Sequence, residues 1–165
     1  MKKAFAAFIV FLALALSACT LNPMSSWPAT LSNFGFSEGD FTVISEDDSH
    51  GGFHGDGDSL IVLDCSGNSD KAVQIVSDWN ALPLSENLQL IMYGGEKDGV
   101  NYAYNLAEEA GIPVVTNGCY RFCDRHSQSS NSTDDSELLG RSSFNFSLAI
   151  YDADTDTLYY YEFDT

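Results

Sequence analysis

The stretch FNFSLAIYDADTDTLYYYEF at residues 144–163 has the most regular pattern in the chain. Its first half alternates large apolar side chains with smaller or polar ones, which is the two-residue period of a β-strand. The large ones are Phe144, Phe146, Leu148 and Ile150. An Asp-rich turn then leads into a second apolar run at residues 158–163. Two such runs across a short turn predict an antiparallel β-hairpin at the end of the chain.

Four other segments have the composition of short strands. Residues 41–45 (FTVIS) and 60–65 (LIVLDC) are β-branched or aliphatic runs bounded by Gly, Asp and Ser. Residues 88–93 (LQLIMY) and 119–124 (CYRFCD) are predicted as further strands, the first of them buried. Because the inner runs are continuous and the C-terminal hairpin alternates, we expect a mixed, mostly antiparallel sheet.

Two segments have helical periodicity. A helix is predicted from about residue 69 to about residue 80, where apolar side chains at Ala72, Ile75, Val76 and Trp79 form one stripe. A second is predicted for residues 99–110, with Gly111 as its C-cap and Pro113 just beyond. The expected fold is therefore a single α+β domain with two helices, a mostly antiparallel sheet and a C-terminal β-hairpin.

The N-terminus has the organisation of an export signal. Lys2 and Lys3 precede an apolar run at residues 4–16, which is too short to span a bilayer. The next residues, Leu16-Ser17-Ala18-Cys19, resemble the lipobox of bacterial lipoproteins. The resemblance covers only the first twenty residues, and it implies cleavage after Ala18 and lipid attachment to Cys19. The alternative is an ordinary secretory signal that leaves Cys19 as a spare thiol.

This assignment divides the chain into three parts. Residues 1–18 are the expected signal peptide, and residues 19–40, rich in Ser, Asn and Pro, are the expected lipid-anchored tether. Residues 41–165 are then the globular domain. The implied location is the cell membrane or the outer membrane, with the domain facing outside the cytoplasm.

The charge is strongly negative. Lys and Arg number 7 against 24 Asp and Glu, for a net charge of −17. Removing residues 1–18 takes away two lysines and no acid, which brings the charge to −19. Such a field excludes nucleic acid as a partner and favours a cationic protein, a small ligand or a divalent metal ion. Solubility outside the cell explains the same charge without any partner.

One Gly-rich segment carries metal-ligand side chains. Residues 46–58 (EDDSHGGFHGDGD) place His50, His54, Asp56 and Asp58 close together in sequence. Imidazole and carboxylate are ligands for Zn²⁺ and similar ions, and glycine allows such side chains to converge. The same residues are also typical of a solvated loop, and the spacing matches no specific metal motif.

Three cysteines remain once Cys19 is assigned to lipid. An exported domain is permitted disulfides, and an odd number allows one bridge at most. We expect Cys65 to pair with Cys119 or Cys123 on a neighbouring strand. The alternatives are buried reduced thiols, or a catalytic or metal site with His126.

These observations predict a membrane-anchored acidic lipoprotein of the cell envelope that is a non-enzymatic binding or interaction module. The alternative is a metal-binding protein or a metal-dependent hydrolase that uses residues 46–58. A surface of tyrosines at residues 159–161 is a further candidate for binding, because one face of that strand would be open to solvent if helices covered only the other.

Overall fold

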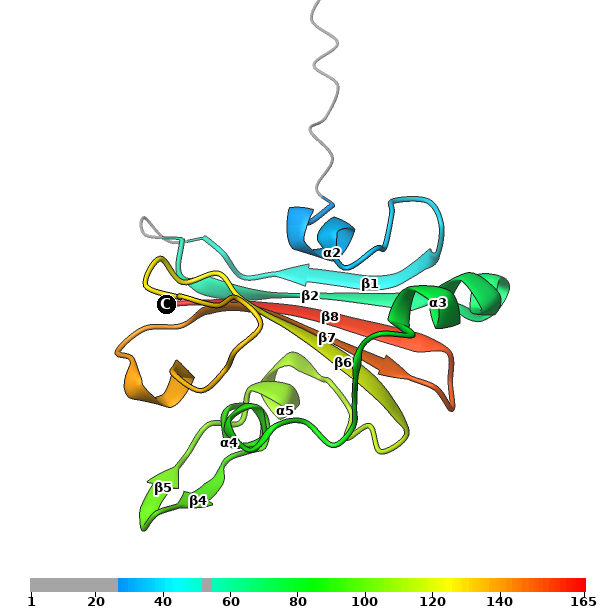
Figure 1. Ribbon diagram of the computed structural model, residues 1–165. Coiled ribbons are helices and arrows are strands. Elements are labelled where there is room, and N and C mark those ends of the chain that lie inside the picture. Colours follow the sequence, from blue (N-terminus) through cyan, green and yellow to red (C-terminus); the bar gives the residue numbers. More distant parts are fainter. Residues whose placement is uncertain (1–26, 52–54) are drawn as a thin grey trace, which may run out of the picture.

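Six strands pair into one sheet that is antiparallel throughout (Figure 1). The computed structural model describes residues 27–51 and 55–165. Across the sheet the order is β1-β2-β8-β7-β6-β3. The strands are β1 (Thr42–Asp48), β2 (Gly57–Asp64), β8 (Thr157–Asp164), β7 (Asn145–Asp152), β6 (Gly118–Asp124) and β3 (Asn80–Ala81). The predicted α+β domain is confirmed, with strands where residues 41–45, 60–65 and 119–124 predicted them.

The predicted C-terminal hairpin forms the centre of the sheet. Strands β7 and β8 pair without interruption from Asn145 opposite Asp164 to Asp152 opposite Thr157. Strand β2 flanks the hairpin on one side and β6 on the other. The rest of the sheet is therefore assembled around this pair.

Both faces of the hairpin are buried, although the alternating pattern of its first strand indicates that only one face is buried. Phe146, Leu148 and Ile150 of β7 belong to one apolar cluster. Ala149 and Tyr151 of the same strand belong to a second cluster, on the opposite face. The tyrosine surface proposed at residues 159–161 is not formed, because the side chains at 160 and 161 are buried, one in each cluster.

Short helices cover the two faces. Helices α2 (Ala29–Asn33) and α3 (Ser69–Val76) contribute to the second cluster, and α4 (Glu86–Tyr93) and α5 (Leu106–Ala110) contribute to the first. Figure 1 shows α2 on one side of the sheet and α4 and α5 on the other. The remaining elements are a small ribbon of β4 (Gly95–Lys97) and β5 (Val100–Tyr102), and 3₁₀ turns at Ser66–Asn68 and Leu138–Gly140.

The strand predicted at residues 88–93 is wrong, because this segment is helix α4. Its N-cap is Ser85, whose hydroxyl accepts a hydrogen bond from the backbone N–H of Leu88 at 3.2 Å. A continuous apolar run has no period that separates a buried strand from a buried helix. The capping serine and Glu86 in the first turn are the signals that indicate the helix.

The helix predicted at residues 99–110 is only partly correct. Asp98 and Gly99 both adopt positive φ, 52° and 77°, and close the β4–β5 ribbon, as Asp-Gly pairs do in tight hairpins. Only Leu106–Ala110 is helical, and Gly111 ends it in the left-handed conformation, as predicted. The helix expected to reach about residue 80 ends at Val76, because Asn80–Ala81 pairs with β6 as strand β3.

The domain also extends further towards the N-terminus than residue 41. Leu31, Phe34 and Phe36 are buried in the second cluster. The indole N–H of Trp27 donates a hydrogen bond to the carbonyl of Phe36 at 3.0 Å. Residues 27–40, which we assigned to the tether, therefore pack on the sheet. The proposed signal segment and Cys19 lie outside the described residues.

Candidate functional site

The segment predicted as a metal-binding loop includes the end of one strand and the start of the next. Strand β1 continues to Asp48 and β2 begins at Gly57, so the connection is confined to residues 49–56. His54 lies outside the described residues. Of the other proposed ligands, Asp56 is exposed, while His50 and Asp58 bind different partners.

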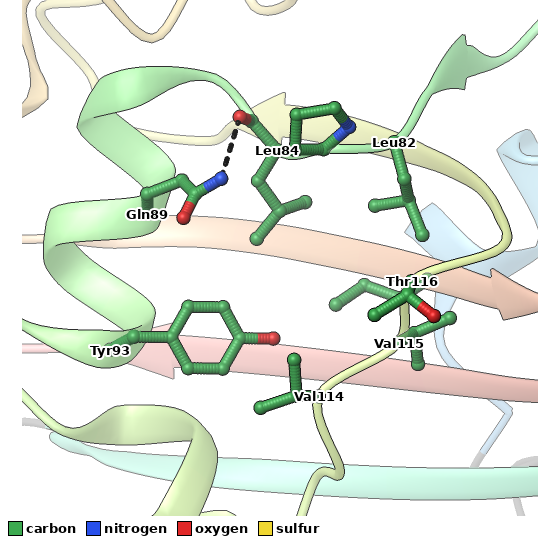
Figure 2. A pocket seen from close by; sticks show the side chains of 9 residues that line it. Leu82, Leu84, Gln89, Tyr93, Val114, Val115 and Thr116 are labelled. Atoms are coloured by element: carbon green, nitrogen blue, oxygen red, sulfur yellow. Dashed lines mark hydrogen bonds between the residues drawn. The ribbon is translucent and has the colours of Figure 1, made fainter.

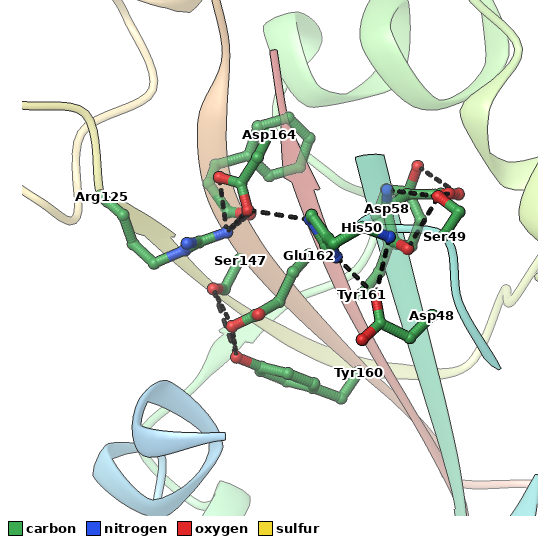
Figure 3. A network of polar contacts seen from close by, with 11 residues as sticks. Asp48, Ser49, His50, Asp58, Arg125, Ser147, Tyr160, Tyr161, Glu162 and Asp164 are labelled. Atoms are coloured by element: carbon green, nitrogen blue, oxygen red, sulfur yellow. Dashed lines mark hydrogen bonds and ion pairs between the residues drawn. The ribbon is translucent and has the colours of Figure 1, made fainter. Parts of the chain in front are cut away.

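His50 lies between two carboxylates (Figure 3). Its Nδ1 is 2.7 Å from Oδ1 of Asp48, and its Nε2 is 3.1 Å from Oδ2 of Asp164. Burial lowers the pKa of His50, but the hydrogen bonds and charges of Asp48 and Asp164 outweigh it, so the pKa is raised overall. Asp164 also pairs with Arg125, whose Nη2 is 3.1 Å away. His50 therefore joins the β1–β2 connection to the end of β8.

Asp58 is held by two other groups. Its carboxylate accepts hydrogen bonds from the hydroxyl of Ser49 and from that of Tyr161, the latter at 3.3 Å. Within residues 27–51 and 55–165, no three His, Cys, Asp or Glu side chains are grouped to hold a metal ion. The structure therefore does not bring the described members of the predicted metal set together.

The three cysteines in the described part of the chain are free thiols. Cys65 directly follows β2, whereas Cys119 and Cys123 lie on β6, and β8 and β7 separate these strands. Three strand spacings amount to about 14 Å, which is beyond the reach of a disulfide. The bridge that we expected between neighbouring strands is not formed, because the strands are not neighbours.

The thiols are also poorly suited to nucleophilic chemistry. Burial, with a smaller contribution from the charges of Asp156 and Asp64, raises the pKa of Cys65 to about 12. Burial likewise raises the pKa of Cys119 and of Cys123. Since the thiolate is the reactive form, all three are held in the less reactive state at neutral pH.

A pocket of about 380 Å³ lies between helix α4, residues 82–84 before it and residues 114–116 before β6 (Figure 2). Its lining is mostly apolar and comes from three places: the connection before α4, the exposed side of α4, and the segment before β6. Ile150 of β7 also contributes to it. The lining residues are Leu82, Pro83, Leu84, Gln89, Tyr93, Val114, Val115, Thr116 and Ile150.

Only three side chains of the lining carry polar groups. Gln89 donates a hydrogen bond from Nε2 to the carbonyl of Leu84 at 3.4 Å, which fixes its amide at the edge of the pocket. Tyr93 extends its ring towards Val114, as Figure 2 shows, and burial raises the pKa of its hydroxyl. Thr116 is exposed, and Val114 is 72% exposed. The pocket is thus an open apolar hollow with a few hydrogen-bonding groups.

The sequence pattern does not indicate this pocket, because the pocket forms only if residues 86–93 are a helix. Gln89 and Tyr93 are one helical turn apart and so lie on the same side of α4. On a strand, residues four apart also share a face, but a strand at 88–93 would have been placed inside the sheet. The only local signals are Pro83 and Pro113, which interrupt regular secondary structure in the two segments that lie next to the helix.

No family model, curated protein or solved structure matches the chain. In the described part of the chain, no helix has the length and apolar character needed to cross a bilayer. The N-terminal motif and the geometry of the pocket are therefore the features that bear on function.

Proposed function

We propose that the mature chain is a lipid-anchored, non-enzymatic binding module of the cell envelope, and that its pocket takes a compact, neutral and mostly apolar ligand. The observation that supports this is the 380 Å³ pocket beside α4. Ligand sites are usually concave and lined by apolar groups, with a small number of polar groups that orient the ligand. Gln89, Tyr93 and Thr116 are the orienting groups here.

The lining favours binding over catalysis. Its polar groups are an amide, a phenol whose pKa is raised, and an aliphatic hydroxyl. A hydroxyl nucleophile needs an adjacent base, and none of the lining residues is a histidine, a carboxylate or a lysine. A neutral ligand is favoured because the lining offers no charge to pair with a charged one.

The anchor is proposed from the residues before the domain. Leu16-Ser17-Ala18-Cys19 would supply the lipid attachment site, and acyl chains on Cys19 would hold the protein at the cell membrane or the outer membrane. A charge of −19 on the remaining chain would repel anionic headgroups and keep the domain away from the bilayer surface.

Binding at the pocket is tested by methyl-detected NMR of the full chain in a neutral detergent, titrated with cyclohexanol as the apolar probe. We expect saturable shifts confined to the methyl groups that line the pocket, among them those of Val114 and Val115. Thr116→Trp should abolish these shifts, because an indole at this exposed position fills the opening. Val73→Trp adds the same ring to an exposed position on α3, outside the pocket, and should leave them unchanged.

Two results would remove the proposal. One is a shift that grows linearly with cyclohexanol and spreads equally to exposed methyls elsewhere, such as those of Val43 and Val73. The other is saturable binding that Thr116→Trp does not weaken. Either would mean that the pocket is not where an apolar ligand binds.

A further inference from the structure

Strand β1 is an open edge of the sheet. Among residues 27–51 and 55–165 it pairs only with β2, and all seven of its residues are exposed. Its apolar residues share this exposure, since Val43 is 46% and Ile44 is 58% exposed. An unpaired edge presents backbone donors and acceptors that a further strand can use. None of these residues lines the pocket beside α4.

The register identifies the backbone groups that point outward. The backbone N–H of Ser49 donates to the carbonyl of Asp58 at 2.8 Å, which marks a hydrogen-bonded pair. In an antiparallel ladder, such pairs alternate with pairs that are not hydrogen-bonded to each other. Asp47 opposite Leu60 is therefore bonded to β2, whereas the N–H and C=O groups of Glu46 and Asp48 point away from it.

Acidic side chains lie on both faces of this edge. Glu46 and Asp48 share one face with Glu162, around a hollow of about 170 Å³ that Ile61 and His50 also line. On the other face, a hollow of about 140 Å³ is lined by Asp47, Asp58, Leu60 and Glu109, among others. Each hollow combines carboxylates with an aliphatic side chain of β2, which suits the apolar stem and charged head of Lys or Arg.

Much of this charge has no counter-charge. Across residues 27–51 and 55–165, no Lys, Arg or His nitrogen comes within ion-pair distance of Glu46, Asp47 or Glu109. Asp48 is the exception, since it pairs with His50. The edge thus has unsatisfied backbone groups and unpaired carboxylates in the same place.

We propose that the β1 edge binds an extended basic segment of another protein, which adds as a further antiparallel or parallel strand next to Glu46–Asp48. The backbone groups of Glu46 and Asp48 would supply the hydrogen bonds. The carboxylates on both faces would select neighbouring Lys or Arg side chains. A second copy of the chain is a poor occupant. Antiparallel self-pairing centred on Asp47 would place Glu46 of one copy directly opposite Asp48 of the other, and like charges in that position destabilise the pair. Each copy also carries a net charge of −17 before processing.

The probe is a nine-residue peptide with Lys or Arg at neighbouring central positions and Thr elsewhere, so that basic side chains face both hollows. It is titrated into the full chain in neutral detergent and followed by backbone NMR. Two modified peptides keep its charge. N-methylation of alternate residues leaves one peptide edge free, whereas N-methylation of adjacent central residues blocks both edges. Strand addition predicts that the first modified peptide binds like the parent and that the second loses at least about tenfold in affinity.

Two variants at one position separate backbone from charge. Glu46→Pro removes an outward N–H without breaking a β1–β2 hydrogen bond, because proline is tolerated on sheet edges, and should weaken binding about tenfold. Glu46→Gln removes only the charge and should weaken it by a smaller factor that shrinks at high salt. Glu96→Gln, an exposed acid on β4, is the matched control and should change binding by less than about twofold.

Each result bears directly on the proposal. The proposal is supported if the parent peptide binds saturably, if blocking both peptide edges abolishes this binding, and if Glu46→Pro weakens it while the variant keeps a native spectrum. No binding of the parent peptide overturns it, as does equal binding of all three peptides. An equal effect of Glu96→Gln and Glu46→Gln would mean non-specific attraction to the acidic surface. A dimer that Glu46→Pro dissociates would identify a second copy as the occupant, which also overturns it.

Discussion

Ala149 provides the most direct test of a sheet buried on both faces. It lies in the middle of β7, opposite Arg121 of β6 and Tyr160 of β8, and none of its surface is exposed. It belongs to the cluster that α2 and α3 cover. On a solvated face, Ala149→Val would be neutral or slightly stabilising, because valine has the higher strand propensity on a scale that spans about 1 kcal/mol. On a covered face, the two added carbons must displace packed neighbours, because protein interiors are close-packed.

The structure therefore predicts the sign of the effect as well as its size. Adding carbons to a close-packed core costs about 1–3 kcal/mol of unfolding free energy. With an m-value of about 2 kcal/mol/M, the midpoint of urea unfolding should fall by about 0.5–1.5 M, with the m-value unchanged. Circular dichroism of the full chain measures both quantities. Ser45→Val, on the exposed strand β1, is the control and should change stability by no more than about 0.5 kcal/mol.

A midpoint for Ala149→Val equal to or above that of the parent chain would refute this reasoning. It would mean that residues 27–41 and α3 do not cover this face. The domain boundary would then return to residue 41, as the sequence alone indicated. A change in the m-value would instead show that the variant alters the unfolded or native state. Ala149→Ser, which adds one heavy atom and not two, would then be the test with the smaller change in side-chain volume.

The other predictions concern the histidine and the cysteines. Because the folded pKa of His50 is raised above its ordinary value of 6.5, its pairs stabilise the fold below that pH and lose this contribution as pH rises through the raised pKa. The loss of unfolding free energy in His50→Gln, measured by urea unfolding, should thus be greatest between about pH 4.5 and 6 and should fall towards pH 9. A loss that grows with pH would contradict the pairing of His50 with the two carboxylates. The buried thiol of Cys65 should be alkylated by iodoacetamide at pH 8 only after unfolding, as read by peptide mass, and rapid labelling of Cys65 in the native chain would contradict its burial. Cys119 and Cys123 are half-buried and their pKa values are raised, so they should react more slowly in the native chain than after unfolding. Cys19→Ser should abolish incorporation of labelled palmitate in cells, whereas persistent labelling would exclude Cys19 as the lipid attachment site.

Local patterns were sufficient for part of the fold. The hairpin at residues 144–163 was predictable because alternation with period two and an Asp-rich turn are both short-range signals. The C-cap at Gly111 is equally local, since only a residue tolerant of positive φ ends a helix in this way. Helix α4 was not predictable from its apolar run, because LQLIMY is compatible with a buried strand or a buried helix.

The candidate site was almost entirely a matter of tertiary structure. The pocket is assembled from residues 82–84, α4, residues 114–116 and β7, and no local pattern links them. The open edge at β1 depends on strand order, since any strand of the sheet could have been outermost as far as composition shows. The cysteine pairing failed for the same reason: two strands, β8 and β7, separate Cys65 from the other thiols.

The sequence by itself determined the strongly acidic charge, the two-residue period of the C-terminal hairpin and an N-terminus that resembles a lipoprotein signal. Each of these depends on composition or on residues within a few positions of one another. Only the tertiary structure decided that both faces of the hairpin are buried, that His50 joins two carboxylates, and that the outer edge of β1 has no partner strand in the described part of the chain. These features depend on contacts between residues far apart in the chain, such as the contact of His50 with Asp164, whose partners are chosen by packing of the whole domain.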